Sequence, residues 1–394
     1  MKKRNVAIIG IGQTNFCSKR DDASIYDIVK EATDIALRDA GITREEIEAI
    51  VFPLAPDSLA GVLNSERWCV DSTSARNKRL IRINTGGSTG LSAVQVAYYH
   101  IASGMNNIVL VAGADKVGES GDVQIIMNKI WDPIYERKLP LTTINMLALS
   151  AIRYMHKYGM TETDMAKVVV KARNHASRNP HAHLRKKVTI DEVLKSRILS
   201  WPIKLFDSCP SSSGGAAMIL ASEDVAKKIC IRPAWIRGIG QSTETYYLGD
   251  RMGTNALNDH ADAYALSESF KRAYKMAGIV NPVKEVDVAE LYNPFSNTEY
   301  HAIDAAGLCE RGESIKLLGD GYFDIDGEVA VNPSGGTLCT NPIAVTGLIR
   351  AGEAALQVMH KAGDRQVKGA KVAIASANGG DHQFFATAVI GQDY

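Results

Sequence analysis

The sequence predicts a layered α/β fold of two duplicated βαβ-type halves, with a loop domain inserted into the first half. Three observations predict this fold. The 394 residues include 45 Lys and Arg against 44 Asp and Glu, and 45% are hydrophobic, which is typical of a folded globular chain. Strand-like and helix-like segments alternate, as they do where helices cover a sheet on both faces. Segments of the first half return in the same order in the second.

The duplication rests on four pairs of segments. Each half begins with a short apolar strand that runs into a Gly-Ile-Gly-Gln turn, followed by a helix-period stretch that stops at a glycine, where a helix C-cap is expected. A second apolar strand and a last strand rich in β-forming residues follow in both halves. The pairs are 6–14 with 234–242, 25–42 with 266–279, 47–52 with 286–292, and 108–113 with 372–380.

Gly-rich turns at 85–90 and 334–347 precede two long helices, expected at 91–102 and 348–361. We therefore expect an N-terminal half at 1–228 and a C-terminal half at 229–394, with largely parallel central sheets. Residues 118–208 have no counterpart in the second half. We expect this block, with helices at 147–157 and 164–174, to be an inserted domain that covers the substrate.

Charge, hydropathy and cysteine spacing exclude several classes of protein. A net charge of +1 argues against a DNA or RNA binder, which needs a clear excess of Lys and Arg. No apolar run approaches the ~18 residues of a membrane span, so we expect none. The six cysteines lie far apart, with neither disulfide nor metal-ligand spacing. This spacing predicts reduced thiols, a cytoplasmic protein and no metal site in this chain.

Two polar motifs have competing interpretations. Gly-Ile-Gly at 10–12 starts like a dinucleotide-binding fingerprint, but Asn15 stands at the third glycine and the motif recurs in the second half. A packing role is therefore favoured. The basic stretch 173–187, which includes Arg178 and His183, is either a solvated turn or a surface for the phosphates of a ligand such as coenzyme A. Its His-x-His pair alone does not indicate a metal.

Residues in two loops are candidates for chemistry. Tyr292 and Asn293 end the strand 286–292, so we expect them at the carboxyl edge of the sheet, where α/β proteins place their sites. Cys339 lies in 332–342, a run so rich in Gly, Pro and Asn that it predicts a shaped loop before a helix. Backbone N–H groups at that helix N-terminus would lower the pKa of a thiol and could hold an oxyanion. The other cysteines are expected to be small core residues.

The duplicated halves and several motifs together resemble the thiolase superfamily over nearly the whole chain. Within it, the sequence is most similar to the sterol-carrier-protein and lipid-transfer branch, and there to the benzoylsuccinyl-CoA thiolases of anaerobic toluene degradation. The resemblance implies a homodimeric enzyme that makes or breaks the bond between the α and β carbons of acyl-CoA thioesters. The motifs are Arg-Tyr-Met-His at 153–156, Asn-Pro-His-Ala-His at 179–183, Phe-Asp-Ser-Cys-Pro at 206–210, Asn-Pro-Ser-Gly-Gly at 332–336 and Asn-Pro-x-Ala-x-Thr-Gly at 341–347.

The resemblance also implies where the site lies, although the usual residues are replaced. The acyl-carrying cysteine of the family corresponds to Gly87, and its second-half Asn or His to Tyr292. The histidine of its Gly-His-Pro motif corresponds to Asn341, and the cysteine of its Cys-x-Gly turn to Ser376. On this basis we assign catalysis to Cys339, Tyr292, Asn341 and His382. We assign substrate or CoA binding to Gly87, Ser88, Asn293, Ser376, Gly379, Gly380, Arg178 and His183.

Two mechanisms and one non-catalytic role are open at this point. In thiolysis of a 3-oxoacyl-CoA, which is favoured, Cys339 carries the acyl group, Asn341 and backbone N–H groups hold the oxyanion, and Tyr292 or His382 moves protons. A candidate substrate is 2-benzoylsuccinyl-CoA, cleaved to benzoyl-CoA and succinyl-CoA. In a retro-aldolase, Tyr292 deprotonates a β-hydroxyl and no acyl-enzyme forms, provided that its pKa falls well below ~10. The third role is an acyl-CoA or lipid carrier.

The resemblance extends to cofactors and partners. It implies coenzyme A as a co-substrate and no covalently bound cofactor. It also implies a small partner subunit with a zinc ribbon and an OB-type fold, so that the zinc would belong to the partner.

Overall fold

The computed structural model describes residues 4–54, 56–252, 258–380 and 382–394, and its helices and strands follow the expected order. The strands are β1 (Val6–Gln13), β2 (Ala49–Pro53), β3 (Arg79–Ile83), β4 (Ile108–Lys116), β5 (Ile198–Ser200), β6 (Ile203–Lys204), β7 (Ser213–Ser222), β8 (Ala234–Thr243), β9 (Val288–Glu290), β10 (Ala330–Val331), β11 (Val372–Gly379) and β12 (Phe384–Gly391). The α-helices are α1 (Ile25–Ala40), α2 (Asp57–Ala60), α3 (Thr89–Ala102), α4 (Val123–Met127), α5 (Thr143–Tyr158), α6 (Glu162–Ala176), α7 (Ile190–Leu194), α8 (Glu223–Ile229), α9 (Tyr264–Ala277), α10 (Pro282–Glu285), α11 (Ser296–Ala305), α12 (Ser314–Gly319), α13 (Gly336–Cys339) and α14 (Thr346–Val358).

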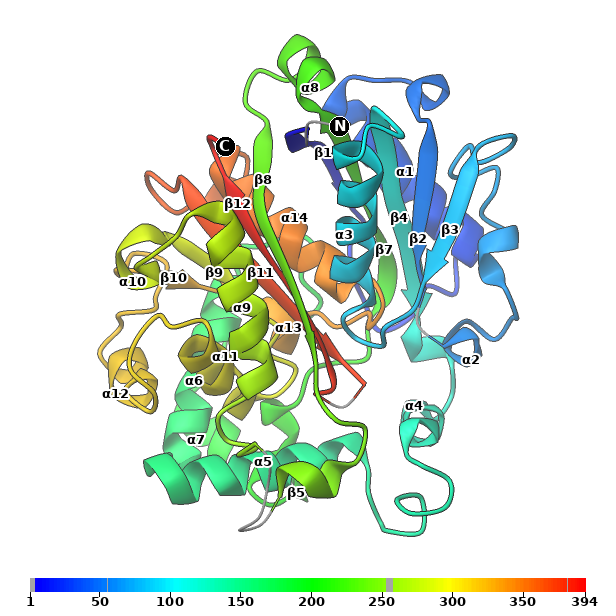
Figure 1. The fold of residues 1–394 in the computed structure, drawn as a ribbon. Coiled ribbons are helices and arrows are strands. Elements are labelled where there is room, and N and C mark those ends of the chain that lie inside the picture. The colour runs from blue at the N-terminus through cyan, green and yellow to red at the C-terminus, as the bar shows by residue number, and fades with distance from the viewer. Residues whose placement is uncertain (1–3, 55, 253–257, 381) are drawn as a thin grey trace.

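The large sheet is symmetric about its centre. Its strand order is β10-β9-β11-β12-β8-β1-β7-β4-β2-β3, with the two halves meeting at the β8–β1 pair (Figure 1). Counted outward from that pair, each half has two antiparallel pairings and then two parallel ones. The repeated segments 108–113 and 372–380 lie in β4 and β11, which hold equivalent places. The predicted duplication and the α/β class are therefore confirmed.

The expectation of largely parallel central sheets is wrong. The Gly- and Ala-rich strands β7 and β12 each run antiparallel to both of their neighbours. They return the chain to the middle of the sheet, so the two halves join into one mixed sheet.

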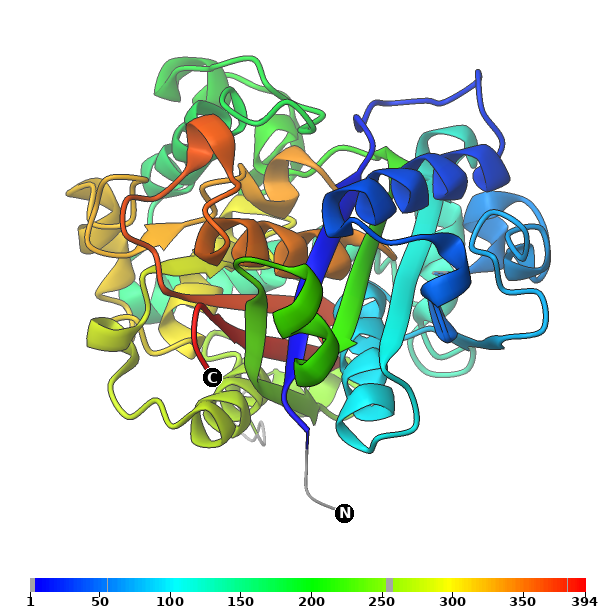
Figure 2. The ribbon, with the colours of Figure 1, turned by 90° about the horizontal axis from the view of Figure 1, so that it is seen from above.

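Helices cover both faces of this sheet. In β1, Val6 and Ile8 face the apolar cluster around α3 and α14, whereas Ala7 and Ile9 face the cluster around α1. This alternation is the period of two that a strand buried on both faces requires. In Figure 2, α1 (blue) and α3 (cyan) lie on opposite faces of the strands of the first half. In the second half, α9 packs on β8 and β12. Helices α3 and α14 pack against each other between the halves.

Both copies of the Gly-Ile-Gly motif lie inside strands, β1 and β8, and helix packing explains their glycines. A β-carbon at Gly10 would lie 2.5 Å from the Ala36 carbonyl oxygen of α1. The equivalent atom at Gly238 would lie 2.1 Å from the Ala273 carbonyl oxygen of α9. Both contacts are too close for any side chain, so the packing interpretation of this motif is confirmed and no dinucleotide is needed to explain it.

The block 118–208 adds no strand to the large sheet. Its strands β5 and β6 form a separate two-stranded sheet, and its helices α5 and α6 pack against α11, α12 and α13 of the second half (Figure 1). The block therefore leaves the first half and lies against the second. Its boundaries, and those of the two halves, stay a prediction. Among the described helices, none is long and apolar enough to cross a bilayer.

Candidate active site

A cavity of about 540 Å³ lies where loops of the two halves and of the inserted block meet. The first half contributes the turn before α3, and the second half contributes the loops after β9 and before α14 and the end of β11. Helices α4 and α5 add an apolar wall with Val123, Met127, Ile144 and Leu147. Of the predicted site residues, Gly87, Tyr292, Asn341, Gly379, Gly380 and His382 line the cavity. Six others do not: Ser88, Asn293, Ser376, Arg178, His183 and Cys339.

The Tyr292 phenol occupies the space beside Gly87. A β-carbon at Gly87 would lie 2.4 Å from the Tyr292 hydroxyl oxygen and 2.5 Å from the Asn378 carbonyl oxygen. No side chain fits at this position unless the phenol and the backbone move. The place that the resemblance assigns to an acyl-carrying cysteine is therefore filled by a hydroxyl from the second half.

Tyr292 is held at its backbone and kept neutral by burial. Its backbone N–H donates to the Ser376 hydroxyl, 3.1 Å away, so Ser376 supports Tyr292 from behind instead of lining the cavity. Burial raises the pKa of the Tyr292 phenol above its usual value, and nearby Cys209 and Asp115 raise it further when they are charged. The phenol is thus protonated at neutral pH and acts there as a hydrogen-bond donor, which is opposite to the lowered pKa that an unassisted tyrosine base needs.

Cys209 lines the cavity, although the sequence interpretation placed it in the core. The Asn341 side-chain N–H donates to the Cys209 sulfur at 3.0 Å. The orientation of the Asn341 amide is fixed because its oxygen accepts from the Thr346 hydroxyl at 2.9 Å and from the Ile343 backbone N–H. Burial raises the pKa of the Cys209 thiol to about 11, although the hydrogen bond from the Asn341 amide lowers this pKa in part. The match of 206–210 to the family was the available signal for this residue.

The assignment of Cys339 to the cavity is wrong. Cys339 ends the short helix α13 and is fully buried in the apolar cluster formed by the inserted block and the second half. Burial raises the pKa of its thiol to about 12. The expected activation by a helix N-terminus does not occur, because the chain turns between Cys339 and Asn341 and sends the thiol into the core.

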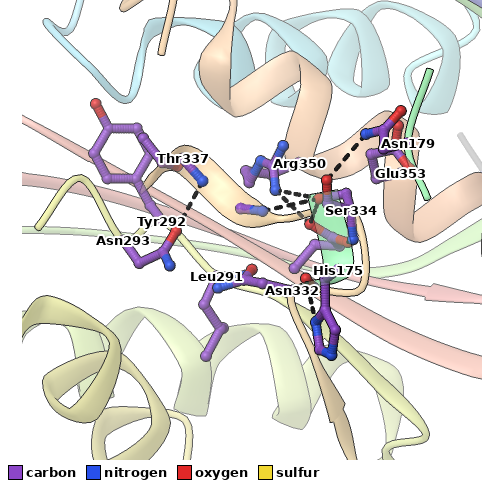
Figure 3. A network of polar contacts seen from close by, with 12 residues as sticks. His175, Asn179, Leu291, Tyr292, Asn293, Asn332, Ser334, Thr337, Arg350 and Glu353 are labelled. Atoms are coloured by element: carbon purple, nitrogen blue, oxygen red, sulfur yellow. Dashed lines mark hydrogen bonds and ion pairs between the residues drawn. The ribbon is translucent and has the colours of Figure 1, made fainter. Parts of the chain in front are cut away.

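Asn293 belongs to a buried polar network behind the cavity (Figure 3). Its side-chain oxygen accepts from the Thr337 backbone N–H at 2.8 Å, and its N–H group donates to Glu299 at 2.7 Å. In Figure 3 the Tyr292 ring points away from these contacts. Asn293 therefore holds the 332–338 loop in shape and does not line the cavity, and its role in substrate binding stays a prediction.

A second part of the network fixes the start of the same loop. Arg350 of α14 donates to the Glu290 carboxylate and to the Ser334 hydroxyl, and all three side chains are almost fully buried. The Ser334 hydroxyl also donates to Glu290 at 2.7 Å. Because buried charges are stable only when they are paired and hydrogen-bonded, this cluster specifies one loop conformation.

Ser88, Arg178 and His183 also lie outside the cavity. The Ser88 hydroxyl donates to the Thr85 carbonyl at 2.8 Å and so caps the turn before α3 from inside. Arg178 is exposed just after α6, and the His183 ring lies 3.0 Å from the Ser212 hydroxyl. Their contact with the phosphates of coenzyme A stays a prediction.

Two residues that line the cavity have a buried polar atom without a partner in the described protein. The Asn378 side-chain oxygen is buried and accepts no hydrogen bond. The His382 Nε2 is also buried and unpartnered, and burial together with nearby His260 and Arg251 holds the pKa of His382 well below its usual value. Unpaired buried groups of this kind are costly unless a ligand or water bonds to them. The described residues contain no group of three or more His, Cys, Asp or Glu suited to a metal ion.

Sequence comparisons agree with this architecture. Residues 6–197 match the model of the thiolase N-terminal domain, and residues 250–392 match that of the thiolase C-terminal domain-like family. The chain is 30% identical to the acetyl-CoA acetyltransferase of Methanothermobacter thermautotrophicus, over 96% of this chain and 97% of that protein. It is 26% identical to the benzoylsuccinyl-CoA thiolase subunit BbsB of Thauera aromatica, over 96% and 95% of the two chains.

Among solved structures, a chain of the Ltp2-ChsH2(DUF35) aldolase superposes with a TM-score of 0.83 and 25% identity, over 99% of this chain and 98% of that one. The chain therefore belongs to the thiolase superfamily, in the branch related to sterol carrier protein 2.

Proposed function

We propose that this protein makes or breaks the Cα–Cβ bond of a β-hydroxyacyl-CoA by aldol chemistry, without an acyl-cysteine intermediate. The observation that carries this proposal is the Tyr292 hydroxyl beside Gly87, because it fills the place of the family nucleophile with a proton donor. The location of Cys339 in the core removes the reason for preferring thiolysis.

The proton transfers of this reaction can be assigned to residues of the cavity. In the addition direction, a thioester enolate attacks the carbonyl carbon of an aldehyde or ketone, and Tyr292 gives its phenolic proton to the new β-oxygen. In cleavage, the β-hydroxyl returns that proton to the tyrosinate, the Cα–Cβ electron pair moves onto the thioester carbonyl, and Cα then takes up a proton. His382, which lines the same cavity, is the residue that supplies this second proton. Asn378 accepts a hydrogen bond from a ligand N–H or O–H.

The acyl group is proposed to be neutral and largely apolar. Met127, Ile144 and Leu147 form one wall, and Asp122 is the single formally charged side chain among the described lining residues. Asp122 is occupied at the start of α4, where it accepts from the backbone N–H groups of residues 124 and 125. A free carboxylate such as that of 2-benzoylsuccinyl-CoA would have no cation to pair with among these residues, at a cost of several kcal/mol.

A second candidate is thiolysis of a 3-oxoacyl-CoA with Cys209 as acyl carrier in place of Cys339. The contact between the Asn341 amide and the Cys209 sulfur favours it, because the same amide could hold an oxyanion at an acyl-cysteine. The similarity to the benzoylsuccinyl-CoA thiolase subunit also supports it. The raised pKa of the Cys209 thiol counts against it, since the thiolate is the nucleophile.

We also propose that the chain works as a homodimer with a partner subunit and that coenzyme A is its thioester carrier or co-substrate. The aldolase that resembles this chain carries a second component in its name, and BbsB is a subunit. A zinc ribbon and OB-type fold for the partner stay part of this proposal. Strand β3 is an open edge of the large sheet with Ile81 exposed, which is a surface that pairing of two protomers would cover.

Two substrates that differ only at the β-carbon separate the candidates. The enzyme, with its partner subunit, is incubated with 3-hydroxy-3-phenylpropionyl-CoA, and separately with 3-oxo-3-phenylpropionyl-CoA plus coenzyme A. Aldol chemistry predicts benzaldehyde and acetyl-CoA from the first, no acylated cysteine by intact-protein mass spectrometry, and loss of turnover in Tyr292→Phe but not in Cys209→Ala. Benzoyl-CoA from the second substrate, with loss in Cys209→Ala, would establish thiolysis instead. Binding of both thioesters without any product would leave the carrier role.

A further inference from the structure

Two buried histidines lie side by side at the inner end of the active-site cavity. His382 follows β11 and lines the cavity, and His260 precedes α9. Their ring centroids are 5.8 Å apart, with an angle of 49° between the rings. The Nε2 atom of each ring is buried and has no hydrogen-bond partner in the described protein. Two adjacent unpartnered nitrogens in a core need an explanation, because a buried polar atom without a hydrogen bond destabilises the folded protein.

Both rings line a second, very small cavity. It has a volume of about 20 Å³, which is room for one water molecule, and its lining includes His260, His382, Glu244 and Asp259. A buried water is stable where it finds two to four polar partners. The two imidazole rings that line this cavity offer two, and a carboxylate of Glu244 or Asp259 offers a third. The small cavity therefore has both the size and the chemistry of a water site.

The small cavity shares lining residues with two larger ones. His382 lines both the small cavity and the active-site cavity. On the opposite side, Asn258, Asp259 and Tyr264 line both the small cavity and an open groove of about 810 Å³ along α9. Asp259 is partly exposed there and pairs with Arg153. Active-site cavity, small cavity and surface groove thus follow one another, with His382 at the first junction and Asp259 at the second.

We propose that His382, one water molecule and His260 form a proton path that links the active-site cavity to the surface groove at Asp259. The proposal rests on the aldol function proposed above. In each hop a ring nitrogen accepts a proton while the other nitrogen of the same ring releases one, so that one proton passes and each ring changes tautomer. No bond to carbon changes and no electron is transferred.

The electrostatic surroundings suit neutral rings. Burial lowers the pKa of His260 to about 3 and that of His382 well below its usual range. Arg251 donates to the His382 carbonyl oxygen at 3.0 Å. Arg251 and His301 also lower the pKa of His260, whereas Asp259 raises it. Both rings are therefore neutral at pH 7, which is the state that can accept at one nitrogen and donate at the other.

The aldol reaction gives this path a task. In cleavage, Tyr292 gains the proton of the β-hydroxyl while a different group, His382, gives one to Cα. After each turnover the first group holds one proton too many and the second one too few. With the acyl-CoA filling the cavity mouth, a path through the protein behind His382 returns the missing proton to His382, and Tyr292 releases its extra proton to solvent when the product leaves the cavity.

The test replaces His260 by glutamine, which keeps a polar side chain of similar size but cannot exchange tautomers. His301→Gln is the matched control, because His301 is equally buried, also has unpartnered ring nitrogens, and lines none of the three cavities. In the enzyme with its partner subunit, His260→Gln is expected to lower kcat about tenfold or more with little change in KM, and to raise the solvent isotope effect. Added imidazole is expected to restore the rate, whereas His301→Gln should behave as the unmodified enzyme does.

A second measurement does not depend on turnover. In protein labelled with ¹⁵N-histidine, exchange of the His382 ring N–H with water is expected to be slower in His260→Gln than in the unmodified protein and in His301→Gln. Equal exchange in all three proteins, or an unchanged kcat and isotope effect in His260→Gln, would overturn the path. If no variant cleaves the β-hydroxyacyl-CoA, the proposed function fails, and the exchange measurement alone decides whether the path exists.

Discussion

Substitution of Gly87 by alanine tests the relation between the missing nucleophile and Tyr292. Alanine adds one methyl group, the smallest change that places a side chain where the family has cysteine. That carbon would lie 2.4 Å from the Tyr292 hydroxyl oxygen and 2.5 Å from the Asn378 carbonyl oxygen. Carbon and oxygen atoms in contact are normally more than 3 Å apart, so one of the two groups must move. Asn378 is part of strand β11, so we expect the phenol to be displaced.

Gly87→Ala overpacks a buried site, so we expect it to lower the free energy of unfolding by about 1 to 3 kcal/mol. Part of this loss comes from the hydroxyl and part from the backbone carbonyl. Tyr292→Phe removes the first contact and leaves the second. The two substitutions should therefore be non-additive, with Gly87→Ala costing about 1 kcal/mol less in the Tyr292→Phe background than alone.

The assay is a double-mutant cycle of urea unfolding midpoints, followed by tryptophan fluorescence, with turnover measured in parallel. Gly352→Ala serves as control, because a β-carbon there would meet its nearest atom at 3.4 Å and α14 gains helix propensity. The free energy of unfolding of Gly352→Ala should be higher than that of the unmodified protein by up to about 1 kcal/mol. Additive effects of Gly87→Ala and Tyr292→Phe, or full activity of Gly87→Ala, would refute the conclusion that the phenol fills the nucleophile position.

Four further outcomes are expected. Turnover of the β-hydroxyacyl-CoA should fall about 100-fold or more in Tyr292→Phe while acyl-CoA binding, measured by calorimetry, persists. Because burial raises the pKa of Tyr292, the tyrosinate needed for cleavage is scarce at pH 7 and increases with pH. The cleavage rate should therefore rise from pH 6 to pH 9, whereas the addition rate, which uses the phenol, should not rise. A cleavage rate that does not change with pH would contradict this role. Cys339→Ala should lower the urea midpoint and leave the catalytic constants intact, in contrast to a catalytic cysteine. Arg350→Met should lower the free energy of unfolding by about 3 to 5 kcal/mol, because it leaves the Glu290 carboxylate buried without its cation. A urea midpoint unchanged from that of the unmodified protein would show that the pair is dispensable.

The sequence predicts the fold well where the chain repeats itself. The pairs 25–42 with 266–279 and 108–113 with 372–380 fall on α1 and α9 and on β4 and β11. Both helices end at a glycine C-cap, Gly41 and Gly278, and both strands are almost wholly buried. The sequence predicts the sheet poorly at β7 and β12. These strands are rich in small residues, and their antiparallel direction depends on pairing with segments more than 200 residues away in the case of β7, which no local pattern reveals.

The site was predictable as far as strand ends determine it. Tyr292, Asn341 and the 379–380 turn lie at one edge because parallel strands bring their carboxyl ends together. Cys339 and Cys209 were misplaced for a different reason. Whether a thiol near Asn341 enters the cavity depends on the short turn of α13, and the thiol that does meet Asn341 comes from a loop 132 residues earlier in the chain. Loop direction of this kind is set by the buried network around Glu290 and not by composition.

The changed residues are better explained by altered chemistry than by loss of function. If the site had only decayed, its polar groups would be expected to pair with one another or to be replaced by apolar ones, since each unpaired buried group costs stability. Asn341 is instead held in one orientation by the Thr346 hydroxyl, and Asn378 and His382, which line the cavity, each keep a buried polar atom without a partner among the described residues. The phenol that fills the nucleophile position is itself supported from behind by Ser376. A protein keeps such costly groups where a bound ligand satisfies them, and in the proposed aldol reaction that ligand presents an oxygen to Tyr292 and a carbon that exchanges a proton with His382.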